Sequence, residues 1–228
     1  MTRHTDKEYE AELRDLRETI LVMAGRCEEM IENSIRALVD RDSDLANKTI
    51  AADHTVNRDE LRIDELCFLI LAKRQPVASD LRFITQALKM ANEMERISDL
   101  AVNISERALL LNKEPQLKPY IDVPRMKELV QKMVRNAIDA FVSGEVDKAY
   151  EVIKQDDEVD ALYQAITREL LKVMTRDIEA VERGIHIQSV AKFLERMADH
   201  SENLAEQVIF MIKGKDVRNT DLPESDAS

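Results

Sequence analysis

Residues 30–57 read MIENSIRALVDRDSDLANKTIAADHTVN, and residues 133–160 read MVRNAIDAFVSGEVDKAYEVIKQDDEVD. When the second stretch is placed under the first at a constant offset of 103 positions, many residues recur. The positions that hold the same residue in both stretches include Met30, Ile35, Ala37, Val39, Asp44, Ala46, Ile50, Asp53 and Val56. Self-similarity at a fixed spacing is typical of a duplicated structural unit. The two stretches therefore predict a fold that is built twice.

A second pair of segments extends this repeat. Residues 95–99 read ERISD and residues 195–199 read ERMAD, so the offset between the copies has become 100. The second copy has therefore lost three residues between the two matching segments. The loss falls near residues 74–80, where Pro76 predicts a turn between two helices. Matches in two separate segments favour a duplication over a chance similarity.

The composition favours helices throughout the chain. Only 4% of the 228 residues are aromatic, and the sequence contains four glycines and no tryptophan. Ala, Leu, Met, Glu, Lys and Arg, which are abundant here, are the residues that favour helices most. Because no segment shows the strict alternation of a half-buried strand, we expect an all-α protein.

Each copy is predicted to form three helices. The first copy gives helices over 7–40, 44–73 and 76–111, and the second gives helices over 125–142, 145–175 and 178–213. We expect Ser43 to be the N-cap of the second helix. Pro76 is well suited to the first turn of the third helix, where a missing N–H costs nothing.

The predicted fold is two tandem antiparallel three-helix bundles, placed end to end. The first bundle covers residues 5–112 and the second covers residues 125–214. Residues 113–124, KEPQLKPYIDVP, contain three prolines and form the predicted linker. Residues 215–228 are small and polar, and we expect them to be a disordered tail.

Charge and hydropathy exclude several classes of protein. The net charge of −12 argues against a nucleic-acid partner, because binding phosphate backbones needs clustered Lys and Arg. The N-terminus is too polar for a signal peptide, and the longest apolar run, residues 67–72, is too short to span or insert into a membrane. We expect a soluble cytoplasmic protein in which Cys27 and Cys67 are buried, reduced thiols.

The third helix of each copy carries one row of acidic and amide side chains spaced four residues apart, which we call a carboxylate ladder. Glu95, Asp99 and Asn103 are four residues apart, so on a helix they fall within a narrow arc. At about 100° per residue, this arc coincides with an apolar stripe that includes Leu88 and Val102. The second copy repeats the arrangement at Glu195, Asp199 and Asn203. Neighbouring half-buried carboxylates repel one another, so a positive charge must compensate them.

The second helix of each copy offers a partner ladder. It holds Asp53 and Asn57 in the first copy, and Asp156 and Asp160 in the second. In an antiparallel bundle the two ladders can face each other, so that four to six oxygens converge. Such oxygen-rich sites suit a divalent or trivalent metal cation such as Mg, Mn or Fe.

Two other interpretations of the acidic ladders stay open. Arg96, Arg196 and further bases could neutralise the acids in interhelical ion pairs, in which case the protein would be a metal-free helical adaptor. Alternatively, the site could belong to a carboxylate-bridged di-metal enzyme, but such sites need Glu three residues before a His. None of the four histidines has this spacing. His54 and His200 are expected to point away from the ligands, and we expect no catalytic residues.

Residues 71–104, LAKRQPVASDLRFITQALKMANEMERISDLAVNI, resemble the central signature of the PhoU family. The similarity extends over nearly the whole chain, through both repeats and up to residues 213–219, KGKDVRN. Ser98 stands where the family usually has glycine, and Ala198 stands at the matching position. Both residues are small enough for close packing, so the resemblance is not weakened.

The resemblance implies a cytoplasmic negative regulator of the phosphate regulon and of phosphate uptake, and not an enzyme. It implies a homodimer that couples the ATPase subunit of a phosphate ABC transporter to a sensor histidine kinase. It further implies metal clusters, whose motifs map onto Glu95 and Asp99 and onto Glu195 and Asp199. The partner ligands would be Asp53, Asn57, Asp156 and Asp160, with Asn103 and Asn203 behind them.

The segment from Arg74 to Arg82 is the most family-like part of the chain. One interpretation is structural: Pro76 begins a helix, and Asp80 and Arg82 form a local pair. The other is that Arg74, Asp80 and Arg82 form a docking surface for the kinase or the transporter. The sequence alone does not decide between them.

Overall fold

The computed structural model describes residues 2–214 of the chain, with side chains from residue 7 onward. Within these residues there are six α-helices, one short 3-10 helix and no strands. The helices are α1 (Thr2–Val39), α2 (Ser43–Lys73), α3 (Ala78–Leu111), α4 (Asp122–Ser143), α5 (Val146–Met174), η1 (Ile178–Ala180) and α6 (Val181–Lys213). The prediction of an all-α fold is confirmed. The predicted tail, 215–228, lies outside the described residues.

Local chemistry explains where the helices begin and end. Asp42, and not Ser43, is the N-cap of α2, because its extended backbone lets Oδ1 accept a hydrogen bond of 2.9 Å from the amide of Leu45. The α4 helix begins at Asp122, three residues before the predicted start, since Pro124 is tolerated in a first helical turn. Gly144 ends α4 with a left-handed φ of 74°.

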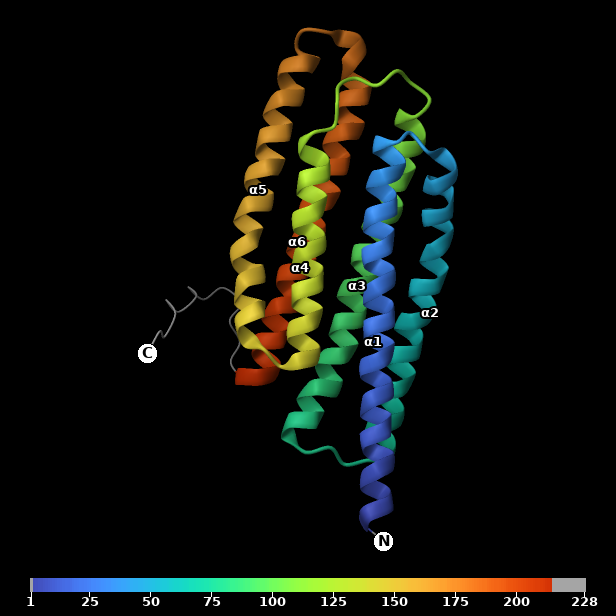
Figure 1. Cartoon of the computed structure of the whole chain (residues 1–228), viewed down its shortest axis with the longest axis vertical. Helices are drawn as coiled ribbons and strands as arrows, with labels where there is room; N and C mark the ends of the chain where they lie inside the picture. Colours follow the sequence, from blue (N-terminus) through green and yellow to red (C-terminus); the bar gives the residue numbers. More distant parts are fainter. Residues whose placement is uncertain (1, 215–228) are drawn as a thin grey trace, which may run out of the picture.

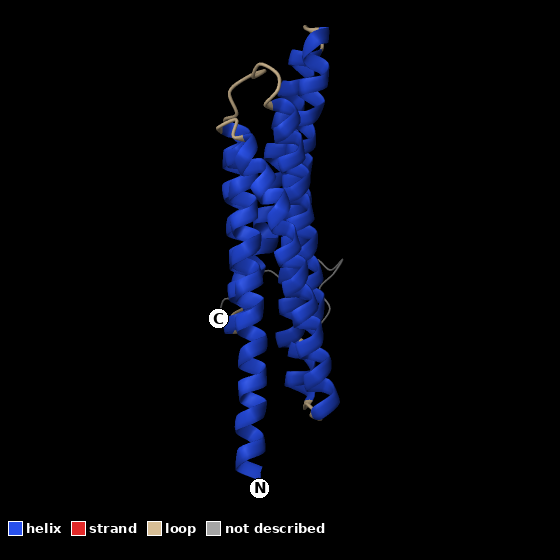
Figure 2. Ribbon diagram, turned by 90° about the vertical axis from the view of Figure 1, so that its right-hand side faces the viewer, coloured by secondary structure: helices blue, strands red, loops and turns tan. Residues whose placement is uncertain are grey.

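The two repeats lie side by side and run in opposite directions. Figure 1 shows α1 rising from the N-terminus and α4 descending beside it, and Figure 2, turned by 90°, shows that the long helices run along one common axis. The contacts agree, because α1 packs on α4 and α3 packs on α6 along their lengths. The Phe83 ring of α3 stacks on the Phe141 ring of α4, with centroids 4.9 Å apart. The predicted end-to-end placement of the bundles is therefore wrong.

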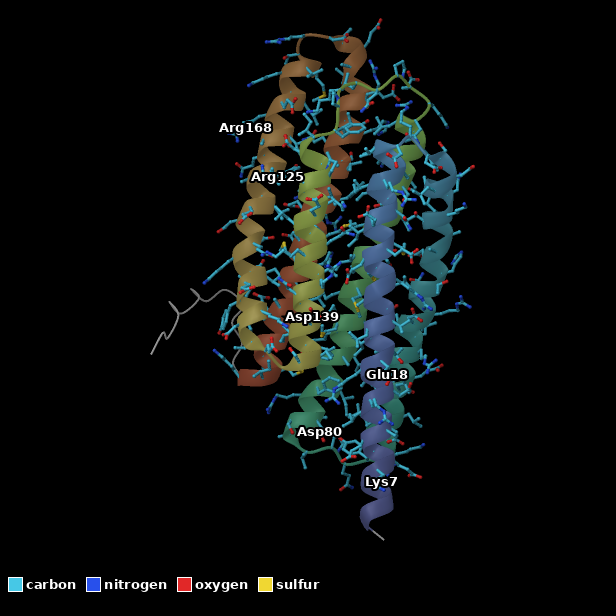
Figure 3. All side chains as sticks on the ribbon, viewed as in Figure 1. Lys7, Glu18, Asp80, Arg125, Asp139 and Arg168 are labelled. Carbon is cyan, nitrogen blue, oxygen red and sulfur yellow. The ribbon has the colours of Figure 1, made fainter. Side chains whose placement is uncertain are left out.

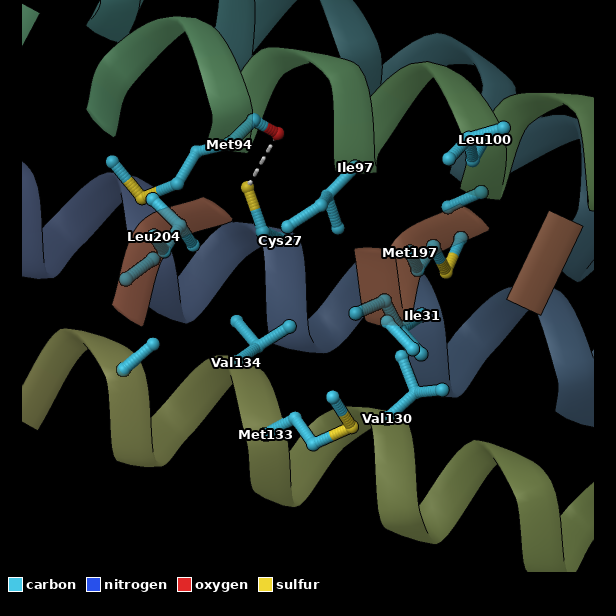
Figure 4. Close-up of a cluster of buried hydrophobic side chains, with 14 of the residues drawn as sticks. Cys27, Ile31, Met94, Ile97, Leu100, Val130, Met133, Val134, Met197 and Leu204 are labelled. Atoms are coloured by element: carbon cyan, nitrogen blue, oxygen red, sulfur yellow. Dashed lines mark hydrogen bonds between the residues drawn. The ribbon is translucent and has the colours of Figure 1, made fainter. Parts of the chain in front are cut away.

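A continuous hydrophobic core joins the repeats. Figure 4 shows Ile31 of α1, Ile97 of α3, Val130 of α4 and Met197 of α6 gathered in one cluster, and all four are fully buried. Because each of these helices buries one face in its own repeat and another against the other repeat, neither repeat is complete alone. The molecule is one body with one core.

The prediction that both cysteines are buried is confirmed. Cys27 and Cys67 are buried and free. The Cys27 thiol donates to the carbonyl oxygen of Met94 at 3.4 Å, the dashed line in Figure 4. Burial raises the pKa of the Cys27 thiol far above its ordinary value, so the thiol is unreactive at neutral pH.

The outer surface is polar and charged. Figure 3 shows side chains such as Lys7, Glu18, Asp139 and Arg168 projecting along the outside of the helices, and all four are exposed. Further charged groups link the repeats, since Arg135 binds Glu28 and Lys127 binds Glu32. Among the described residues, no helix is long and apolar enough to span a membrane.

Candidate functional site

In the first repeat, the ladders of α2 and α3 face each other. The Ser98 hydroxyl of α3 lies 3.4 Å from Asp53 Oδ1 of α2, and it also donates to the Glu95 carbonyl oxygen at 2.8 Å. On α2, the Asn57 side chain donates to Asp53 Oδ2 at 2.9 Å. The contact between the helices therefore depends on the small, fully buried Ser98. A large side chain there would separate the two ladders.

Glu95 and Asp99 lie at the edge of the apolar stripe of α3. The Glu95 side chain is 17% exposed and the Asp99 side chain is 43% exposed, so only the first continues the buried face. Arg96, their neighbour, approaches both carboxylates, at 3.4 Å from Glu95 Oε2 and 3.5 Å from Asp99 Oδ2. Glu95 Oε2 nevertheless accepts no hydrogen bond. One arginine compensates two acids only in part.

The electrostatics of the first site favour protonation or a bound cation. Burial and then the Asp99 carboxylate raise the pKa of Glu95 above its usual range. Burial and then Asp53 raise the pKa of Asp99. Glu60, seven residues beyond Asp53 on α2, also has a raised pKa because of burial and the nearby Asp64. Glu60 is not among the predicted site residues, although its spacing from Asp53 places it on the same face of α2.

The second repeat holds a denser acidic cluster between α5 and α6. Burial, followed by the carboxylates of Glu202, Asp160 and Asp199, raises the pKa of Asp156 to about 7. Burial also raises the pKa of Asp199 and of Glu202. Asp156 Oδ1 is buried and has no hydrogen-bond partner. Glu202, which takes part in this cluster, is not among the predicted site residues.

The bases that approach the acids come from the same helix. In the second repeat, Lys192 donates to both oxygens of Glu195 at 2.5 Å, three residues further along α6. In the first repeat Arg96 has the same role. The expected interhelical pairs through Arg96 are therefore replaced by pairs within α3. Both bases form their ion pairs with acids of their own helix, although the charge of Arg96 also acts on Glu60 of α2 and opposes the rise of its pKa.

The carboxylate and amide oxygens of both sites suit a hard cation, although they do not yet surround a single point. Buried oxygens without partners lie at both sites: Asn57 Oδ1 and Glu95 Oε2 in the first, and Asp156 Oδ1 in the second. Among residues 7–214, no three His, Cys, Asp or Glu side chains lie close enough to hold one ion in this conformation. Carboxylates without a cation repel one another, so side-chain rotation would have to accompany binding.

Asn103 and Asn203 occupy different surroundings. Asn103 is half-buried one turn beyond Asp99 on α3. Asn203 donates to Glu93 Oε2 at 3.4 Å, across the interface between the repeats. His200 Nδ1 donates to the same oxygen at 2.6 Å. His54 is exposed on α2.

The three residues of the suggested docking surface have internal partners. Arg74 binds Glu12 at 3.0 Å and Glu8 at 3.2 Å, which fastens the end of α2 to α1. Asp80 accepts a hydrogen bond of 2.9 Å from the Tyr9 hydroxyl. Arg82 Nε donates to the carbonyl oxygen of Met211 at 2.9 Å, near the end of α6. The expected local pair of Asp80 with Arg82 is wrong, because the two bind different helices.

The raised pKa of Asp156 gives a prediction for protein treated with chelator. The pKa of Asp156 is about 7 in the folded protein and about 4 in the unfolded chain, so the folded state binds the proton more tightly. Protonation of Asp156 therefore stabilises the fold, and this contribution is complete below about pH 4. This contribution is lost as the pH rises through 7. Asp156→Asn should therefore stabilise the protein at pH 8 by about 1 kcal/mol, allowing for solvent screening of a half-buried group. Thermal unfolding should show a Tm higher by about 2–4 °C.

The advantage of Asp156→Asn should shrink steadily as the pH falls from 8 to 4. Asp139→Asn, which changes an exposed carboxyl on α4, is the matched control and should leave the Tm nearly constant. An Asp156→Asn variant that is no more stable than the wild type at pH 8 would show that the acids do not repel.

Known proteins resemble the chain over both repeats. A sequence profile of the PhoU domain matches residues 20–108 and 123–208. The phosphate-specific transport system accessory protein PhoU homolog of Pseudomonas aeruginosa is 40% identical, over 97% of this chain and 92% of that protein. The phosphate-specific transport system accessory protein PhoU of Escherichia coli is 32% identical, over 99% of this chain and 94% of that protein.

Solved structures agree with these sequence matches. A crystal structure of PhoU from Pseudomonas aeruginosa superposes with a TM-score of 0.87 at 39% identity, over 91% of this chain and 100% of that one. The phosphate transport system regulatory protein PhoU from Streptococcus pneumoniae gives a TM-score of 0.86 at 26% identity, over 94% of this chain and 100% of that one. The domain profile matches both repeats and the relatives are 32–40% identical over nearly the whole chain, so the chain belongs to the PhoU family.

Proposed function

We propose that the chain is a cytoplasmic negative regulator of phosphate uptake and of the phosphate regulon. The observation that carries this proposal is the similarity to a phosphate-specific transport system accessory protein over 97% of the chain. A relative of known structure is named a regulatory protein of phosphate transport. These names describe accessory and regulatory proteins, and they support a role without catalysis.

The proposed partners are the ATPase subunit of the phosphate ABC transporter and a sensor histidine kinase. A protein that bridges two partners must hold two surfaces in a fixed relation. The shared core of Ile31, Ile97, Val130 and Met197 supports this role, because it fixes one repeat against the other. The outer helices of the two repeats would then present one surface to each partner.

A reporter strain tests the regulatory proposal. Deleting the gene should switch on a phosphate-regulon reporter in phosphate-rich medium, and the wild-type chain should restore repression. Purified chain should bind the purified ATPase subunit and the cytoplasmic part of the kinase in biolayer interferometry. A reporter that stays repressed in the deletion strain, together with no binding to either partner, would contradict the proposal.

We further propose that each repeat binds a metal cation. In the first repeat the ligands would come from Asp53, Asn57, Glu95 and Asp99, and in the second from Asp156, Asp160, Glu195 and Asp199. The raised carboxyl pKa values of Glu95, Asp99, Asp156 and Asp199 support this proposal. So do the buried oxygens without partners on Asn57, Glu95 and Asp156. A bound cation would supply positive charge that holds the two ladders of a repeat together. Elemental analysis of the purified protein tests for it.

A homodimer is part of the proposal. Leu61 and Phe68 lie seven residues apart on the outer face of α2, and they are 61% and 62% exposed. Seven residues are two helical turns, so both side chains lie on one stripe. An exposed apolar stripe of this kind supports self-association, which analytical ultracentrifugation measures directly. Phe68→Glu should shift the protein toward monomer.

A further inference from the structure

A cavity of about 590 Å³ lies between the repeats, where α3 crosses α6. Its lining includes Gln86, Leu88 and Glu93 from α3, and Asn203, Gln207 and Phe210 from α6. None of these residues belongs to the carboxylate ligand sets proposed above. The volume lies in the range of pockets that hold small molecules, about 300–1,000 Å³.

Two residues that line this cavity carry a buried amide oxygen without a partner. Gln86 is only 3% exposed, and its Oε1 accepts no hydrogen bond. Gln207 Oε1, from the opposite helix, is also buried and unpaired. Contacts between packed helices are usually apolar, and each buried oxygen without a partner costs about 1–3 kcal/mol. A molecule that enters the cavity with N–H groups would remove this cost.

The charge in the cavity favours a cationic guest. Glu93 Oε2 is fixed by the donors His200 Nδ1 at 2.6 Å and Asn203 Nδ2 at 3.4 Å. Asn203 therefore donates one N–H to Glu93, whereas the two buried glutamine atoms without partners are acceptors. Leu88 and Phe210 add apolar surface beside them. Lys89, the basic residue of the lining, is exposed.

We propose that this cavity binds a small alkylamine of the diamine or polyamine class. The ammonium groups would donate to Gln86 Oε1, Gln207 Oε1 and the Glu93 carboxylate, and the alkyl chain would lie against Leu88 and Phe210. Because α3 and α6 belong to different repeats, bound amine would join the repeats. The proposal does not depend on phosphate regulation or on bound metal.

Calorimetric titration of the full-length protein with 1,4-diaminobutane and with spermidine tests this inference. The titrations are made at 0.3 M salt, since the net charge of −12 attracts any cation to the surface. Saturable binding of one amine per chain is expected, with 1,4-butanediol, which has the same length and no charge, showing none. Gln86→Leu and Gln207→Leu should each weaken amine binding about tenfold or more.

Gln155→Leu is the matched control. Gln155 Oε1 is also buried without a partner, but Gln155 does not line the cavity, so its replacement should leave the affinity unchanged. Thermal unfolding of each variant shows whether it is folded, and Gln207→Leu provides the test if Gln86→Leu is not. The proposal is overturned if neither amine binds, since water then fills the cavity. The proposal is also overturned if the diol binds as tightly as the amines. The same holds if Gln86→Leu and Gln207→Leu bind the amines as tightly as Gln155→Leu does.

Discussion

Ile97→Ala should lower the free energy of unfolding of the whole chain by about 2–5 kcal/mol. Ile97 is fully buried on α3, and it lies beside Ile31, Val130 and Met197 in Figure 4. Truncation to alanine removes three buried carbon atoms and leaves a cavity that neighbours from several helices cannot close. Because these neighbours come from both repeats, the loss should reach the second repeat as well as the first.

Two measurements test this prediction: equilibrium unfolding in urea, and amide hydrogen exchange of each repeat in the native protein. We expect one cooperative transition in wild type and variant, and faster exchange in α5 and α6 as well as in α2 and α3. Leu171→Ala, at an exposed position of α5, is the control and should change stability by less than about 0.5 kcal/mol. Two separate transitions, with exchange in α5 and α6 unchanged, would contradict a shared core.

The helices themselves could be predicted because their signals are local. Pro76 lies in the loop two residues before α3 begins at Ala78, and not in the first turn as predicted, but it does mark the break between α2 and α3. Gly144 supplies the left-handed residue that ends α4. Where two neighbouring residues could both cap a helix, as at Asp42 and Ser43, the choice depends on backbone angles that the sequence does not show. The resulting error is one residue.

The arrangement of the repeats could not be predicted in the same way. A periodic apolar stripe shows that a helix buries one face, but it does not show which helix covers that face. Ile31 on α1 and Val130 on α4 are typical core residues whether the bundles lie end to end or side by side. Only long-range contacts such as the stacked rings of Phe83 and Phe141 distinguish the two arrangements.

The candidate site shows the same division between repeated and single features. Asp53 and Glu95 could be selected because Asp156 and Glu195 repeat them in the second copy. Glu60 and Glu202 could not, since Tyr163 and Val102 stand at the matching positions. A search for repeats therefore finds the acids that the two sites share and misses those that make each site different.

Glu95→Ala combined with Asp99→Ala should abolish metal binding in the first repeat and leave the second repeat loaded. Removing both carboxylates takes away half of the proposed ligands there, whereas Asp156, Glu195 and Asp199 belong to other helices and stay intact. Elemental mass spectrometry of protein purified without chelator or a histidine tag measures the metal content per chain. Glu195→Ala combined with Asp199→Ala should give the converse loss.

Thermal unfolding connects this loss of metal to stability. With metal at about a hundred times its dissociation constant, each occupied site should add roughly 2.7 kcal/mol. Each double variant should therefore keep one such increment of the two found in the wild type. Without metal, the variant that lacks Glu95 and Asp99 should instead be more stable than the wild type. The reason is that the substitutions remove the burial and repulsion that raise the pKa values of these two carboxyls.

Glu18→Ala combined with Asp139→Ala is the control, since it removes two exposed carboxyls from α1 and α4 and should leave metal content unchanged. Wild-type protein that holds no metal after reconstitution with Mg²⁺, Mn²⁺ or iron would contradict the metal proposal. The ladders would then be partly protonated carboxylate networks compensated by Arg96 and Lys192. In that case the chain would regulate as a metal-free adaptor, and the variant that lacks Glu95 and Asp99 should still be more stable than the wild type.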